Sequence, residues 1–257
     1  MINWDPEIYL QYKECIMRPA VELLSRIDMS PPARICDLGC GPGNSTKLLQ
    51  QRWPEARIMG IDNDENMLRK AKSCGVKANW CLADLGEWQP EISADLIFSN
   101  AALHWLGDHA ALFAKLMTFV RPGGVVAVQM PRNFTSPSHT IIQQVVETGP
   151  WADALRDVRD FNPVARPEKY YEVLSGHAAA LDIWETEYLH VLNGADPVYD
   201  WISGTALTPY LTRLDGKHRQ AFIARCRERL TRVYRRRADG TTLFLFRRLF
   251  IIATAKE

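Results

Sequence analysis

Between residues 31 and 130 the chain alternates short apolar runs with segments whose apolar residues recur at helical spacing. The predicted strands lie at 34–36, 57–62, 78–82, 95–100 and 125–130. Breakers such as Trp53-Pro54 and the tetrapeptide from Arg121 to Gly124 end the intervening helices. Strands that recur with a helix between each pair favour a parallel, doubly wound α/β sheet.

The regions on either side follow other patterns. Residues 5–27 carry apolar positions at helical spacing, and Pro19 is predicted to begin a second helix there. Beyond Pro131, prolines interrupt helical segments until 181–191, whose alternation predicts a sixth strand. The remaining predicted elements are helices at 197–214 and 216–234 and a last strand at 241–253. We expect the insertions after strands five and six to form a helical cap over a cleft.

A glycine-rich loop follows the first strand, in the stretch ICDLGCGPGN at 35–44. Glycines are needed where the backbone takes an unusual φ or lies directly against a ligand. Asn44 or Ser45 is predicted to cap the next helix, whose free N–H groups and dipole favour an anionic group. The pattern is therefore strand, glycine turn and helix.

The spacing of the glycines separates this loop from phosphate-binding loops. In a dinucleotide fingerprint the third glycine comes one residue later than Gly43, and a Walker loop requires Gly-Lys-Ser/Thr where this chain has Asn44. Asp37 stands two residues before the first glycine, where it would repel a pyrophosphate but attract an ammonium or sulfonium group. The pattern D-x-G-x-G-x-G closely resembles the first motif of class I S-adenosylmethionine-dependent methyltransferases.

This resemblance implies an α/β fold with a Rossmann-like, seven-stranded and mostly parallel sheet, helices on both faces and the helical cap after strands five and six. It also implies a single domain over 1–257. Within it, we expect N-terminal helices at 1–30, the cofactor-binding core at 31–130, the cap insertions with strand six at 131–240 and the last strand at 241–257.

Acidic residues at the strand ends extend the cofactor hypothesis. Asp62 ends the second strand, near the roughly 20-residue offset from Gly39 that suits a carboxylate on ribose hydroxyls, although a turn or capping role stays open. The resemblance implies that Asp84 binds the adenine amine, with a helix cap as the alternative, and that Met67 covers the adenine or belongs to the core. The predicted cofactor-binding residues are Asp37, Gly39, Cys40, Gly41, Asn44, Asp62, Asn63, Met67, Ala83, Asp84, Leu85, Asn100, Ala101 and His104.

His104 follows the fourth strand, at the expected mouth of the cleft. We interpret it as a wall or substrate contact packed beside Trp105 rather than as a general base. No catalytic residue is predicted. Methyl transfer depends mainly on positioning, and a base is needed only where the acceptor must lose a proton. An acceptor such as a carboxylate, with a pKa of about 4, is already ionised at neutral pH.

The composition of the chain narrows the classes of function that remain open. The chain has 257 residues, 47% hydrophobic content and a formal net charge of +1. A near-neutral charge gives no overall field toward nucleic acid or a membrane, and no apolar run approaches the roughly 20 residues that span a bilayer. The first residues lack the basic and apolar regions of a secretory signal. We therefore expect a cytoplasmic protein that binds neither nucleic acid nor a membrane, and the oligomeric state stays open.

Two further sets of residues invite other interpretations. The six cysteines show no paired C-x-x-C spacing, and Cys36-x-x-x-Cys40 lacks a second pair, so we expect reduced thiols and no metal site. Seven arginines lie between 225 and 237. Glu228 and Asp239 relieve this charge and only Tyr234 is interleaved, which favours a solvated helix face over a nucleic-acid surface.

A closer resemblance extends almost from end to end. It rests on W-D-P-x-x-Y-L from Trp4, R-P-A-V-E-L-L from Arg18, A-V-Q-M-P from Ala127, the segment W-x-x-x-T-x-L-x-P from Trp201 and R-L-F from Arg248. These segments resemble the trans-aconitate 2-methyltransferases. The resemblance implies methyl transfer to one carboxylate of trans-aconitate, giving a monomethyl ester. The stretch 203–206 departs from the A-T-G-L form of that family, which leaves the substrate range open.

A polycarboxylate substrate calls for cationic and hydrogen-bonding groups, and an arginine fork matches a carboxylate in two places. The predicted substrate-binding residues are Arg18, Arg132, Tyr171, His190, Trp201, Thr205, Tyr210 and Arg248, of which Arg248 and Trp201 rank first. Three alternatives stay open: a methyltransferase for an acyl carboxylate bound to a carrier protein, a cofactor-binding regulator without catalysis, and an RNA methyltransferase.

Overall fold

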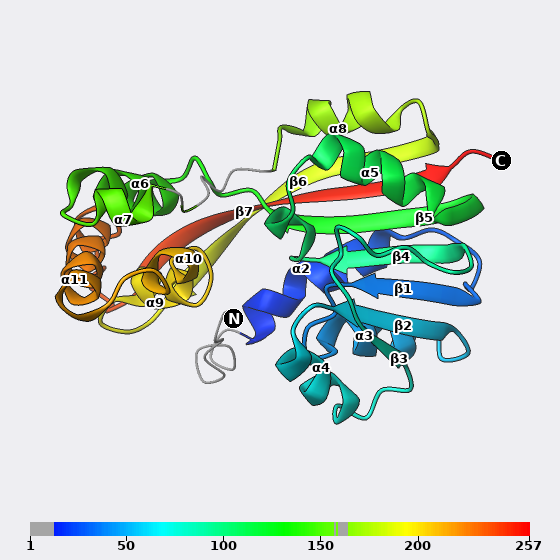
Figure 1. The fold of residues 1–257 in the computed structure, drawn as a ribbon, viewed down its shortest axis with the longest axis horizontal. Coiled ribbons are helices and arrows are strands. Elements are labelled where there is room, and N and C mark those ends of the chain that lie inside the picture. Colours follow the sequence, from blue (N-terminus) through cyan, green and yellow to red (C-terminus); the bar gives the residue numbers. More distant parts are fainter. Residues whose placement is uncertain (1–12, 157, 159–163) are drawn as a thin grey trace. The chain divides into compact units, whose positions relative to one another are not determined.

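The computed structural model describes residues 13–156, 158 and 164–257, so the segment from Trp4 and the helix expected before residue 13 lie outside the described residues. Its strands form one seven-stranded sheet in the order β3-β2-β1-β4-β5-β7-β6 (Figure 1). The strands are β1 (Arg34–Leu38), β2 (Arg57–Asp62), β3 (Asn79–Leu82), β4 (Ala94–Asn100), β5 (Val120–Pro131), β6 (Ala178–Leu192) and β7 (Thr242–Ala255). β1 to β5 pair in parallel and β7 runs antiparallel to β5, which confirms the predicted fold class.

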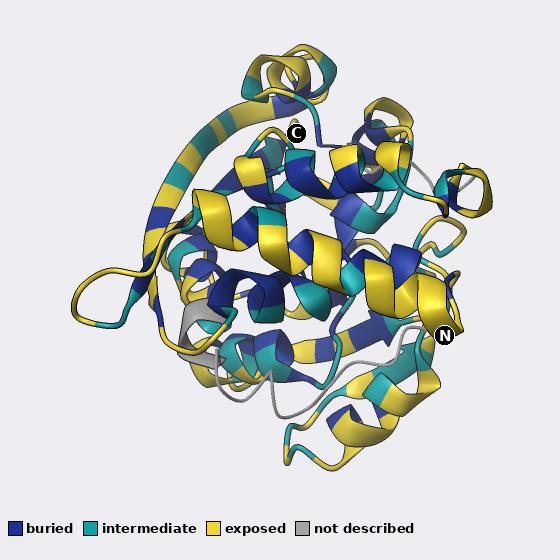
Figure 2. Ribbon diagram, turned by 90° about the vertical axis from the view of Figure 1, so that its left-hand side faces the viewer, coloured by how far each residue is buried: buried dark blue, intermediate teal, exposed yellow. Residues whose placement is uncertain are grey.

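Helices connect these strands. They are α2 (Lys13–Arg26), α3 (Asn44–Arg52), α4 (Glu65–Lys72), the 3-10 turn η1 (Leu103–Trp105), α5 (His109–Thr118), α6 (Pro137–Thr148), α7 (Ala152–Leu155), α8 (Pro167–Leu174), α9 (Pro197–Ser203), α10 (Thr208–Leu211) and α11 (Gly216–Val233). Most carry a buried stripe on one side and an exposed stripe on the other (Figure 2), as amphipathic helices on a core require.

The chain divides into two compact units. The core unit holds the described residues 14–131, 164–186 and 248–257, and the helical unit holds 132–156 and 187–247. The long strands β6 and β7 contribute residues to both units. α8 belongs to the core unit, where Tyr170 Oη lies 2.5 Å from His109 Nδ1 of α5. The insertion after β5 is therefore shared between the two units.

The centre of the core unit is apolar on both faces of the sheet. Leu96, Ile97 and Phe98 of β4 are fully buried, as are Val126 and Ala127 of β5. Continuous burial of this kind is what a parallel sheet covered on both faces requires, and it explains why these strands read as unbroken apolar runs.

Three predicted element boundaries are wrong. Pro19 does not begin a helix but lies inside α2, where its buried ring is accommodated although it donates no backbone hydrogen bond. The helix expected over 197–214 is split into α9 and α10, because Gly204 ends the first and Pro209 fits the opening turn of the second. β5 starts at Val120 rather than Val125, with a register shift against β4.

Candidate functional site

The glycine loop joins β1 to α3 through three left-handed glycines. The φ angles of Gly39, Gly41 and Gly43 are 71°, 53° and 89°. A Cβ on Gly39 would lie 2.1 Å from the Cβ of Ala102, whereas a Cβ on Gly41 would meet nothing within 4 Å. Gly39 is thus required for packing, and the backbone of Gly41 borders open space that a ligand can occupy.

Asp37 lies at the end of β1 and is fully buried. Its Oδ2 accepts hydrogen bonds from Ser45 Oγ at 2.8 Å and Thr46 Oγ1 at 2.6 Å, and its Oδ1 has no partner among the described residues. Burial raises the pKa of Asp37 to about 6 against the opposing effect of the two hydroxyls. A cation placed beside this carboxyl would lower its pKa.

The predicted cap on α3 is wrong. Gly43 occupies the N-cap position with no side-chain hydrogen bond, and the hydroxyl of Ser45 donates to Asp37 instead. Sequence reasoning missed Ser45 and Thr46 as the residues that hold Asp37. Two consecutive hydroxyl residues directly after the loop were the available signal.

Asp62 ties the end of β2 to the glycine loop. Its Oδ2 accepts from the backbone N–H of Gly41 at 2.8 Å and its Oδ1 from that of Asp64 at 2.9 Å. Burial raises the pKa of Asp62, and the hydrogen bonds from backbone N–H groups oppose this. The carboxylate therefore fixes the loop conformation and lies beside the open space at Gly41.

The residues after β3 form a turn near the same loop. Asp84 Oδ1 accepts from the backbone N–H of Gly86 at 2.7 Å within this turn, and no described helix begins between β3 and β4, so the helix cap left open for Asp84 is wrong. Leu85 lies near the loop, since its Cδ1 would be 3.6 Å from a Cβ on Gly39. Met67 of α4 is half-buried. The remaining predicted residues here are Cys40, which is buried; Asn44 and Ala83, which are half-buried; and Asn63, which is exposed.

The end of β4 brings several polar groups together. Ala101 adopts a φ of 54°, and its N–H donates to the carbonyl of Gln129 at 2.9 Å. A left-handed conformation in a residue other than glycine is strained, and such strain clusters at functional sites. Asn100 Oδ1 is buried without a partner among the described residues. His104 is buried with its ring centroid 4.8 Å from that of Trp105, as a wall residue would be.

Gln129 belongs to the A-V-Q-M-P segment that carries the resemblance, but it was not among the predicted site residues. It is fully buried in β5, in register with Asn100 of β4. Neither Oε1 nor Nε2 has a partner among the described residues. The signal in the sequence was one amide inside the otherwise apolar run 125–130.

The predicted substrate residues are divided between the two units. In the core unit, Arg18 is exposed on α2, Tyr171 is exposed on α8, and Arg248 is buried on β7 opposite Pro131. Arg248 has only 7% of its surface exposed, whereas Tyr171 has 60%.

In the helical unit, the rings of His190 and Trp201 lie 4.5 Å apart within a buried aromatic cluster that includes Phe244. Tyr210 is buried with its ring 6.2 Å from that of Phe222, and Thr205 Oγ1 donates to the carbonyl of Ile202. Arg132 lines a cavity of about 390 Å³, with Arg247 and Asn133 among its other lining residues.

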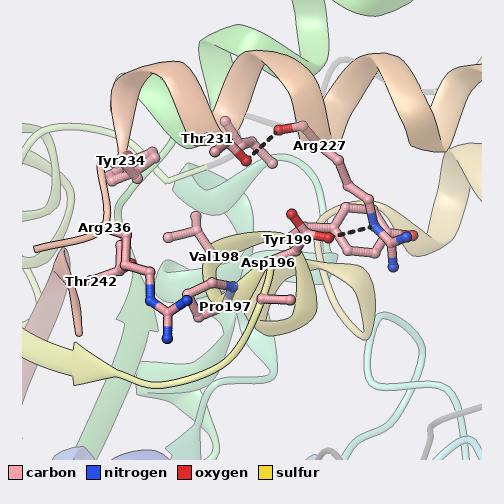
Figure 3. Close-up of a pocket in the computed structure, with 11 residues that line it drawn as sticks. Asp196, Pro197, Val198, Tyr199, Arg227, Thr231, Tyr234, Arg236 and Thr242 are labelled. Carbon is pink, nitrogen blue, oxygen red and sulfur yellow. Dashed lines mark hydrogen bonds and ion pairs between the residues drawn. The ribbon is translucent and has the colours of Figure 1, made fainter. Parts of the chain in front are cut away.

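The arginine-rich helix α11 lies in the helical unit. Arg227 pairs with Asp196 at 3.4 Å and its guanidinium lies 4.4 Å from the ring centroid of Tyr199, beside a cavity of about 30 Å³ (Figure 3). That volume suits a single water molecule. Arg232 pairs with Glu228 on the same helix.

Comparison with known proteins identifies the family. The chain is 42% identical over 253 residues to the trans-aconitate 2-methyltransferase of Azoarcus sp. strain BH72, covering 98% of this chain and 99% of that protein. It is 41% identical to the Acidovorax ebreus enzyme of the same name and 40% identical to that of Yersinia pestis strain Pestoides F, which it covers completely. The chain belongs to the trans-aconitate 2-methyltransferase family. A methyltransferase domain model also matches residues 35–124, the segment that holds the glycine loop.

Solved structures show the same methyltransferase fold. The Bacillus subtilis protein YcgJ matches with a TM-score of 0.61 and 14% identity, over 93% of this chain and 99% of that one. A phosphoethanolamine N-methyltransferase of Haemonchus contortus, solved with S-adenosyl-L-methionine, matches with a TM-score of 0.56 and 17% identity over 93% of this chain and 53% of that one. Among the described residues, no helix is long and apolar enough to cross a membrane, and no cluster of three metal-ligating side chains is found.

Proposed function

We propose that this trans-aconitate 2-methyltransferase family member transfers a methyl group from S-adenosylmethionine to one carboxylate of trans-aconitate, giving a monomethyl ester. The observation that carries this proposal is the similarity to the Azoarcus enzyme at 42% identity over 98% of the chain. The similarity includes both the glycine loop of the core unit and the whole helical unit. A match confined to the loop would say nothing of the substrate.

The residues at the end of β1 and β2 suit this cofactor. Asp37 and Asp62 place two carboxylates beside a loop that leaves open space at Gly41, and Asp37 Oδ1 is a buried acceptor with no described partner. We propose that they hold the positively charged and hydroxyl groups of the cofactor, together with the predicted residues around Met67, Asp84 and Asn100. When bound, S-adenosylmethionine supplies a methyl group already activated on a sulfonium sulfur.

The protein residues then have to position the acceptor and exclude water. A carboxylate is ionised at neutral pH, so no general base is required. In the reaction a lone pair of the carboxylate oxygen forms the new O–CH₃ bond, the electrons of the S–CH₃ bond return to sulfur, and no proton is transferred. Holding two reactants in line is worth roughly 7–11 kcal/mol of the barrier. The buried ring of His104 fits the wall of such a site.

For the substrate we propose Arg248 of the core unit, which ranks first with Trp201 among the predicted residues. Arg248 carries a guanidinium and is 7% exposed. Its fork matches the planar geometry of a carboxylate. We also propose that the protein acts in the cytoplasm on a small molecule, which is supported by five free thiols among its described cysteines.

The test is an assay of the purified protein with methyl-labelled S-adenosylmethionine and a panel of di- and tricarboxylates. We expect label in a base-labile ester that forms fastest with trans-aconitate. Tight binding of the cofactor without ester from any acid would overturn the proposed substrate class.

A further inference from the structure

The amide side chain of Gln129 is buried in a place where nothing in the described chain uses it. The residue is fully buried, and neither its Oε1 nor its Nε2 has a hydrogen-bond partner among the residues that the structure describes. A buried polar group that makes no hydrogen bond destabilises the fold, so a residue kept at this position for stability would be apolar, like Val126, Val128 and Met130 around it.

Strand register shows which face of the sheet this amide occupies. Gln129 is paired with Asn100 of β4, and residues in register on parallel strands project to the same face. Phe98, two residues before Asn100, pairs with Asp37, whose carboxyl contacts the hydroxyls of α3. Asn100, Gln129 and Asp37 therefore share one face of the sheet, and the two amides follow Asp37 toward the carboxyl ends of the strands.

The same face carries the predicted substrate arginine. On the other side of β5, Gln129 pairs with Phe250 and Pro131 pairs with Arg248, so Arg248 lies one same-face position beyond Gln129 along the β5–β7 pair. The ring centroids of Trp184 and Phe250 lie 4.7 Å apart, and Trp184 Nε1 donates to Glu22 Oε1 of α2. Trp184 and α2 therefore pack beside Phe250 on this face. The unpartnered amide thus lies between Asn100, at the proposed cofactor end, and the buried cation of Arg248.

We propose that Gln129 is a substrate-positioning residue, whose Nε2 donates a hydrogen bond to the carboxylate that becomes methylated. This inference rests on the proposed function. A neutral carboxamide suits the role because it orients one carboxylate oxygen and carries no charge that would bind it as tightly as an arginine does. The second oxygen keeps its lone pairs for attack on the methyl group. No proton moves and no bond is made to the protein.

The test replaces Gln129 by an apolar residue of similar shape and follows stability and binding together. In Gln129→Met we expect the melting temperature of the free protein to stay equal or to rise, because an unsatisfied amide is removed. We expect KM for trans-aconitate to rise at least tenfold, the thermal shift produced by trans-aconitate in the presence of S-adenosylhomocysteine to disappear, and cofactor affinity to stay within twofold. Gln129→Leu repeats the test with a second side chain, and Gln144→Leu, at an exposed position of α6, is the matched control.

The outcomes separate the two proposals. A lower melting temperature with unchanged KM and an unchanged trans-aconitate shift would show that Gln129 is structural and would overturn the inference alone. A wild-type protein that binds the cofactor but neither binds nor methylates trans-aconitate would overturn the proposed function itself.

Discussion

At the scale of single residues, the two carboxylates at the ends of β1 and β2 differ in what holds them. Asp37 is fully buried and held by two hydroxyls, whereas Asp62 accepts two backbone N–H groups and remains partly exposed. Hydrogen bonds from backbone N–H groups fix the conformation of a loop. Asp62 therefore has two roles: it stabilises the loop, and it is proposed to bind the cofactor. Substitution separates these roles.

Asp62→Asn should weaken cofactor binding more than it weakens the fold. Loss of a hydrogen bond to a charged group costs about 1.5–3 kcal/mol, which corresponds to roughly a 10- to 100-fold rise in Kd by calorimetry. Asp64→Ala is the control, since Asp64 caps α4 by accepting from Asn66 and Met67. We expect it to lower stability by about 1 kcal/mol and leave the Kd unchanged. Equal effects of both variants on the Kd would contradict the assignment.

Asp37 should make stability depend on pH. Its folded pKa of about 6 lies above the ordinary value of 3.8, so between these pH values the folded state binds more protons than the unfolded state and stability falls as pH rises. Asp37→Asn removes this effect. The difference in free energy of unfolding between variant and wild type should therefore shift by about 2.4 kcal/mol in favour of the variant from pH 4 to pH 7.5. Urea titrations at the two pH values measure this difference. A difference that stays constant would contradict a raised pKa of Asp37 in the folded state.

Arg248→Ala should raise KM for trans-aconitate by roughly 10- to 100-fold while cofactor affinity holds, because a charged hydrogen-bonding partner of a carboxylate is lost. Arg247→Ala is the neighbouring control, since Arg247 is partly exposed and pairs with Glu187. Steady-state kinetics with both variants decide the matter. If only Arg247→Ala loses affinity for trans-aconitate, the substrate is bound by Arg247 and not by Arg248.

At the scale of elements, hydrophobic pattern was enough to predict each strand of the sheet, because the central strands are unbroken apolar runs and the segment that forms β6 alternates. Boundaries depended on local geometry that the pattern does not carry. Pro19 within α2 and the break between α9 and α10 are examples. In the candidate site, the acids and glycines were predicted from spacing, but the hydroxyl partners of Asp37 and the unpartnered amide of Gln129 depend on which side chains meet after folding.

The two glycines of the loop should respond differently to alanine. Gly39→Ala places a Cβ 2.1 Å from Ala102 and should unfold or strongly destabilise the core unit. Gly41→Ala meets no atom within 4 Å and costs only the left-handed strain of about 1–2 kcal/mol, yet its Cβ fills the space proposed for the cofactor. Melting curves and cofactor titrations should show a folded Gly41→Ala protein that binds poorly. Tight binding by that variant would place the cofactor elsewhere.

At the scale of the whole molecule, family and fold are established by different comparisons. The full-length match to curated relatives establishes the family, and the structural match to YcgJ at 14% identity establishes only the shared fold. The sequence alone predicted both. The acid-glycine loop indicated the fold, and the segments around Trp201 and Arg248 indicated the family. The substrate remains a proposal for this chain, since its 203–206 segment departs from the family's form.

The most direct test of the central claim is a competition experiment. The purified protein, with labelled S-adenosylmethionine, receives trans-aconitate, a saturated tricarboxylate and a malonyl-loaded carrier protein in one vessel, and the products are separated by mass spectrometry. We expect kcat/KM for trans-aconitate to exceed that for either competitor by at least tenfold and the product to be a base-labile monomethyl ester. Preferential methylation of the carrier-bound acyl group would contradict the account and assign the helical unit to docking a protein.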